Sequence, residues 1–104
     1  MQQWEYFYFV TQRFGHEAWI INEDFIVSDA FDIERSYPSS KFKRKKIEMT
    51  GEGVWYCYPA ELKTDILGKS VIEALNVVGT QGWELVSVKR SDYEHYYYFK
   101  RPKE

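Results

Sequence analysis

The chain has 104 residues, a formal net charge of −2, and a composition that is 44% hydrophobic and 19% aromatic. The length predicts one domain, 1–104, and the hydrophobic content excludes a disordered chain. The slight negative charge excludes a global attraction to nucleic acid or anionic lipid, so either would need a local patch. Nine Tyr, seven Phe and four Trp exceed the needs of one small core, which predicts a ring-bearing surface that meets a partner.

The single cysteine, Cys57, excludes an internal disulfide and fits a reducing compartment. The first residues lack the basic start and apolar run of a signal peptide. No apolar stretch approaches the roughly 18 residues that span a bilayer. We therefore expect a cytoplasmic protein without membrane contact.

The first predicted element is a strand over residues 4–10, W-E-Y-F-Y-F-V, in which all but one residue is aromatic or β-branched. Alternation places its tyrosines on one face and its phenylalanines on the other. Since both faces carry rings, we expect both to be covered. Residues 18–21 are a second candidate strand, paired with the first.

The charge changes sign in the middle of the chain. Residues 17–34 contain six acidic residues and no Lys or Arg, whereas residues 41–46 contain five basic residues in six. Clustered cations beside a ring suit phosphate binding and base stacking. The candidate ligand-binding residues here are Lys41, Phe42, Lys43, Arg44, Lys45 and Lys46. We favour the alternative that this run is a solvated edge strand or loop, and the acidic segment is able to pair with it within the chain or across a subunit boundary.

Residues 47–49 and 54–58 are predicted to form a hairpin around a glycine turn, and residues 60–67 contain a short helical turn. Ser70 and Glu73 then form a capping box for the main helix, 70–79, whose apolar residues recur on one face. Gly79 is expected to end this helix in the left-handed conformation.

A strand over residues 83–88 and a last strand over 95–100 complete an antiparallel hairpin. The expected fold is α+β: a mostly antiparallel sheet of about five strands with the helix packed on one face. The terminal strand and the helix-strand-strand segment make the core. Residues 11–67 are an elaboration that lengthens the sheet.

Three short segments carry a family resemblance: W-E-Y at 4–6, L-N-V-V-G-T-Q-G-W-E-L at 75–85, and K-R at 100–101. This pattern resembles the small bacterial and phage proteins known as domain of unknown function 4177. The match covers the first ten residues and about the last 35, and it leaves out the middle of the chain. The resemblance implies a small α+β fold and no activity.

No motif points to catalysis, a metal or a cofactor. His16, His95 and Cys57 stand in separate segments without metal-ligand spacing. Neither a nucleophile elbow nor a glycine loop preceding a helix is present. Cys57 lies among bulky strand residues and is expected to be buried and inert. Trp83 is expected to pack under the helix with Glu84 facing water, rather than to line a ligand cleft.

Tyr96 and Tyr98, beside the tyrosines of the first strand, suit either base stacking or an oligomer face, and we favour the oligomer face. The first functional hypothesis is a non-catalytic interaction module that binds a protein partner or associates with itself as a homo-oligomer. The alternatives are a binder of a small anionic ligand, such as a nucleotide held between subunits, and a single-stranded nucleic-acid binder that uses the basic run.

Overall fold

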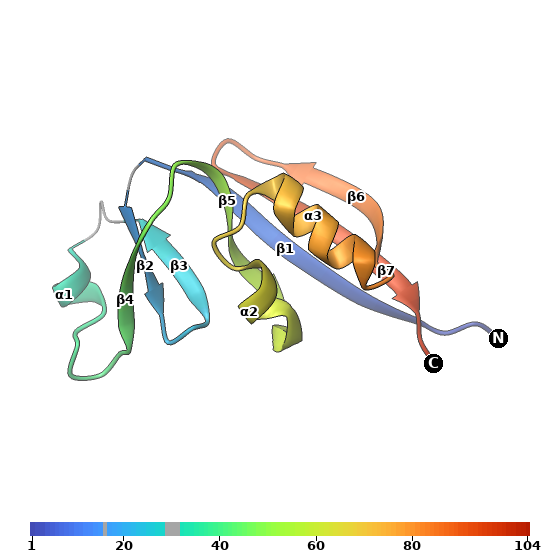
Figure 1. The fold of residues 1–104 in the computed structure, drawn as a ribbon, viewed down its shortest axis with the longest axis horizontal. Helices are drawn as coiled ribbons and strands as arrows, with labels where there is room; N and C mark the ends of the chain where they lie inside the picture. The colour runs from blue at the N-terminus through green and yellow to red at the C-terminus, as the bar shows by residue number, and fades with distance from the viewer. Residues whose placement is uncertain (16, 29–31) are drawn as a thin grey trace.

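A computed structural model describes residues 1–15, 17–28 and 32–104. Its strands form two antiparallel sheets, one of four strands and one of three (Figure 1). In chain order the elements are β1 (Trp4–Phe14), β2 (Glu17–Ile21), β3 (Phe25–Ser28), α1 (Ile33–Ser36), β4 (Arg44–Glu48), β5 (Gly51–Tyr58), the 3-10 turn η1 (Ala60–Leu62), α2 (Lys63–Ile66), α3 (Val71–Thr80), β6 (Glu84–Arg90) and β7 (Glu94–Pro102).

The larger sheet has the order β5-β1-β7-β6 and unites the two ends of the chain. One of its faces carries Phe7, Phe9 and Phe99, which are at most 3% exposed. Ala74 and Val78 of α3 pack in the same core cluster, so the helix covers this face, as Figure 1 shows. The predicted α+β class, the helix on one face of the sheet and the closing β6–β7 hairpin are confirmed.

The main helix begins where its capping box predicts. The Ser70 hydroxyl accepts a hydrogen bond from the Glu73 N–H at 3.3 Å and donates one to the Glu73 carboxylate at 3.0 Å. Its end differs from the prediction, because Gly79 lies inside α3 and the left-handed residue is Gly82, at φ +85°. The helix therefore runs to Thr80 before the chain turns into β6.

The smaller sheet corrects two expected pairings. β2 pairs with β3 and β4 rather than with β1, and β4 pairs with β2 rather than in a hairpin with β5. The physical reason is the length of β1, which extends to Phe14. Because β5 pairs along one of its edges and β7 along the other, β1 has no free edge for β2, and β5 is not available to β4. The described residues therefore form seven strands, where about five were expected.

The two sheets are joined through a second core cluster. Phe14 from the end of β1 packs there with Ala18, Ile26 and Met49. Leu67, after α2, contacts this cluster and also the cluster under α3. Residues 11–67 were expected to lengthen the sheet, and of these only β5 and the end of β1 belong to the four-stranded sheet. β2, β3 and β4 instead form a separate small sheet beside its end.

Candidate functional site

The face of the larger sheet opposite α3 is lined by tyrosines. Alternation along β1 places Tyr8 between Tyr58 of β5 and Tyr98 of β7, and Val10 between Tyr56 and Tyr96. Tyr6, two residues before Tyr8, points the same way. We call this set the tyrosine face; it comprises Tyr6, Tyr8, Tyr56, Tyr58, Tyr96 and Tyr98. Among the described residues, neither core cluster includes any of them.

The rings of the tyrosine face pack side by side around Tyr8. Its centroid lies 5.8–6.4 Å from those of its four neighbours on β5 and β7. Tyr6 is 68% exposed and Tyr58 is 59% exposed, while the other four are half-buried. The expectation that both faces of the first strand are covered is therefore wrong.

Two hydroxyls on this face, those of Tyr8 and Tyr96, have a raised pKa. Burial, followed by the neighbouring tyrosines, raises the pKa of Tyr8 above its ordinary value. The Tyr96 hydroxyl donates a hydrogen bond to Glu94 at 2.9 Å, and this bond is the first cause of the raised pKa of Tyr96. The face thus presents aromatic rings with hydroxyl groups that can donate and accept hydrogen bonds.

Sequence reasoning placed Tyr96 and Tyr98 beside the first strand, and the structure places them there. It missed Tyr56 and Tyr58 as members of the same surface. The reason is the hairpin predicted for residues 47–58, which assigned their strand a different neighbour. The alternation of tyrosines at 56 and 58 was the available signal.

The basic run is spread over both faces of the smaller sheet and is largely neutralised. Carboxylates of the acidic segment lie 3.8 Å from Lys43, 2.7 Å from Arg44 and 2.9 Å from Lys46. Those carboxylates belong to Glu23, Glu34 and Glu17, respectively. The predicted pairing of acidic and basic segments therefore occurs within the chain.

Members of the run also contact aromatic rings. Arg44 and Lys46 lie over the Trp19 ring, at 5.4 and 5.3 Å from its centroid. Phe42 packs edge-on against Tyr37, at 5.3 Å between centroids, and Lys41 is exposed. The run thus includes an edge strand, β4, as favoured from the sequence. None of its residues lies in a strand of the four-stranded sheet.

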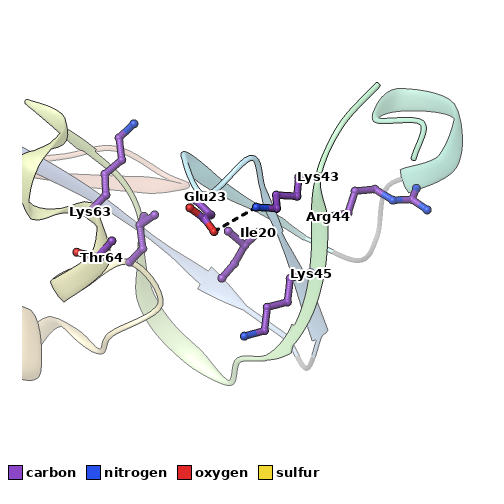
Figure 2. A pocket seen from close by; sticks show the side chains of 8 residues that line it. Ile20, Glu23, Lys43, Arg44, Lys45, Lys63 and Thr64 are labelled. Atoms are coloured by element: carbon purple, nitrogen blue, oxygen red, sulfur yellow. Dashed lines mark ion pairs between the residues drawn. The ribbon is translucent and has the colours of Figure 1, made fainter. Parts of the chain in front are cut away.

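A cavity of about 430 Å³ lies between the smaller sheet and α2. Figure 2 shows Lys43 paired with Glu23, and Lys45 extending on the same side of β4, while Arg44 points the opposite way. Lys63 of α2 also lines the cavity, and its ammonium is held 2.6 Å from Asp24. Lys45 is exposed and has no ion-pair partner in the described part of the chain.

The three segments of the family resemblance meet at the other end of the larger sheet. The Arg101 guanidinium lies 4.2 Å from the centroid of the Trp83 ring and donates hydrogen bonds to Glu5 at 2.5 Å and to the Gln81 carbonyl at 2.8 Å. Trp83 is 9% exposed and Glu84 is exposed, so their predicted placement is confirmed. These contacts tie both terminal strands to the turn after α3.

The thiol is buried, and the described histidine is paired with a carboxylate. Cys57 is 1% exposed, and burial raises the pKa of its thiol to about 11. His95 pairs through Nδ1 with Glu52 at 2.6 Å, and His16 lies outside the described residues. Within residues 1–15, 17–28 and 32–104, no three His, Cys, Asp or Glu side chains gather as metal ligands would. No helix in these ranges is long and apolar enough to cross a bilayer.

Comparison of the chain with protein-family models, with curated proteins and with solved structures finds no match. The resemblance to domain of unknown function 4177 therefore stays a prediction from the three quoted segments.

Proposed function

We propose that this chain is a non-catalytic interaction module that binds a protein partner through the tyrosine face. The observation that carries the proposal is the asymmetry of the larger sheet: α3 packs on its phenylalanine face, and the opposite face holds six tyrosines, two of them more than half exposed. Tyrosine combines a large apolar ring with a polar hydroxyl, and it is enriched at the centres of protein interfaces.

The charge distribution favours a protein over a nucleic acid. Binding to a phosphate backbone needs clustered cations beside the stacking rings. On the tyrosine face the lysines are Lys89 and Lys100, and they are matched in number by the carboxylates of Glu84 and Glu94. Lys100 lies over the Trp4 ring at 4.3 Å, and Glu94 accepts a hydrogen bond from Tyr96. The basic run belongs to the other sheet, where three of its cations meet carboxylates.

The test is site-specific photocrosslinking from this face. A benzophenone amino acid replaces Tyr6, and in a matched control it replaces Ile72, which is 73% exposed on α3. We expect protease-sensitive adducts from position 6 that disappear when Tyr58→Ser is added, and none from position 72. Nuclease-sensitive adducts from position 6, or equal protein adducts from both positions, would contradict the proposal.

A second candidate function is binding of a small anionic ligand in the cavity beside α2. Lys45 supports it, because this cation has no carboxylate partner among the described residues while Lys43 is held only at 3.8 Å. Calorimetric titration with inorganic phosphate and with a nucleoside triphosphate tests this candidate. Binding that is lost in Lys45→Ser but kept in Lys41→Ser supports it; no heat from either ligand refutes it.

A cytoplasmic location and membership in the domain of unknown function 4177 family belong to the same proposal. The single buried thiol supports a reducing compartment. The meeting of Glu5, Trp83 and Arg101 supports the family pattern, because it gives residues of all three segments a common structural role.

A further inference from the structure

The two edges of the four-stranded sheet are not alike. At the β5 edge, the Val54 N–H donates to the Lys69 carbonyl at 3.0 Å, and the Val54 carbonyl accepts from the Gly68 N–H at 2.9 Å. At the other edge, β6 bonds only to β7 among the described residues. Figure 1 shows β6 at the margin of the sheet. One edge therefore presents unpaired backbone donors and acceptors.

The unpaired edge also exposes three apolar side chains. Leu85 is 44% exposed, Val86 is 54% exposed and Val88 is 38% exposed. Leu85 and Val88 stand opposite Phe99 and Tyr97 of β7, on the face that α3 covers. The helix does not extend far enough to bury them, so an apolar row lines the free edge.

A β-bulge at Val86 changes which residues of β6 share a face. The pairing with β7 slips between Leu85 and Ser87, so Leu85 and Val88 lie on one face although they are three positions apart. For the same reason Glu84, opposite Lys100, and Lys89, opposite Tyr96, both lie on the tyrosine face. Neither Glu84 nor Lys89 has an ion-pair partner in the described part of the chain.

We propose that two copies of this chain pair through β6, antiparallel, about a two-fold axis perpendicular to the sheet and passing between Val86 and Ser87. This axis places Leu85 of each copy opposite Val88 of the other on the helix face. It places Glu84 of each copy opposite Lys89 of the other on the tyrosine face. Side chains of the same face and of complementary character therefore meet twice across the axis.

The bulge is what makes this register possible. In a regular strand, residues an odd number of positions apart point to opposite faces, so Leu85 and Val88 would not meet across such an axis. With the extra residue in both strands, the bulges face each other at the axis and both flanking segments match. Bulges and lysines commonly protect an edge from pairing, but here each bulge has its counterpart and each lysine an opposing carboxylate.

The pairing would join the two four-stranded sheets into one and place both tyrosine faces on the same side. The inference goes beyond the proposed function, because a monomer can bind a partner through its tyrosine face equally well. The two ideas also fail separately, since one depends on Glu84 and Lys89 and the other on Tyr6 and Tyr58.

Sedimentation over about a hundred-fold range of concentration tests the dimer, with Glu84→Lys, Lys89→Glu and the double variant compared. The wild type is expected to dimerise. Each single variant should raise the dissociation constant about tenfold, because two pairs become repulsive in each dimer. The double variant exchanges the charges and should return the constant to near the wild-type value.

Glu61→Lys, on the exposed turn before α2, is the matched control for altered net charge and should sediment as the wild type. A wild type that stays monomeric throughout overturns the inference. A dimer in which the double variant is as weak as the single variants also overturns it. A dimer that is lost in Tyr6→Ser/Tyr58→Ser and kept in Glu84→Lys would place the self-association on the tyrosine face instead.

Discussion

Replacing Trp83 by Ala should remove a large part of the stability of this chain. The Trp83 ring is 9% exposed and lies 5.4 Å from the Phe7 ring, and the Arg101 guanidinium lies 4.2 Å from its centroid. A buried aromatic of this size removes roughly 150–250 Å² from water, or about 4–6 kcal/mol at about 25 cal/mol per Å². Measured Trp→Ala substitutions in cores cost about 3–5 kcal/mol. Since Arg101 also loses its ring contact, we expect about 4–5 kcal/mol.

Urea unfolding followed by far-UV circular dichroism measures this loss as a lower midpoint at an unchanged slope. Trp4→Ala is the matched control, because Trp4 is 38% exposed and should cost about 1 kcal/mol or less. Should Trp83→Ala not fold, Trp83→Phe should still fold. Its urea midpoint should be lower than the midpoints of the wild type and of Trp4→Ala. A Trp83→Ala midpoint equal to that of the wild type would refute the placement of this ring under α3.

Further predictions concern the basic run, the thiol and the terminal ion pair. In urea unfolding, Arg44→Ser should cost about 1.5–3 kcal/mol, because the Arg44 side chain is 15% exposed and binds Glu34. Lys45→Ser should change the stability by less than about 0.5 kcal/mol. Equal losses would contradict the unequal burial of these two side chains. The pKa of Cys57 is raised from 9.0 to about 11, so the stability it contributes is complete below pH 9 and is lost as the pH rises through about 11. Cys57→Ala should therefore flatten the fall in stability over that window, and a parallel fall would count against the buried thiol. A double-mutant cycle on Glu5 and Arg101, which are 37% and 33% exposed, should yield a coupling of about 0.5–1 kcal/mol, and a zero coupling would show that the pair adds nothing to stability.

Local patterns predicted the elements that local physics determines. The capping box at Ser70 located the start of α3, and the strong strand propensity of residues 4–10 located β1. The antiparallel hairpin of β6 and β7 followed from a short polar connection between two strand-like runs. In each of these cases the decisive residues are neighbours in sequence.

Strand partners in the middle of the chain were not predictable in this way. Residues 47–49 and 54–58 look like a hairpin, but β5 turns back along β1 and β4 pairs with β2. The difference depends on β1 extending to Phe14, through the polar residues 11–13, which carry little strand signal. The tyrosine face was therefore only partly predictable, because Tyr56 and Tyr58 join it through this long-range pairing.

The basic run illustrates the limit for candidate sites. Its charge pattern alone suggests a phosphate-binding surface, and the preceding acidic segment alone suggests a surface that repels phosphate. Only their pairing, with Arg44 held 2.7 Å from Glu34 and Lys46 held 2.9 Å from Glu17, shows that they largely cancel. Composition indicated a surplus of aromatic residues, and the fold shows that much of this surplus is on one face of one sheet.

Native mass spectrometry of gently purified protein, with the wild type compared to Tyr6→Ser/Tyr58→Ser, shows whether the tyrosine face holds a protein partner. We expect the wild type to carry a protein partner in addition to an even multiple of the chain mass. The variant should lose the partner and keep the multiple of the chain. A wild type that is a bare monomer, or one whose extra mass is a nucleotide or an oligonucleotide, would contradict a protein-binding tyrosine face.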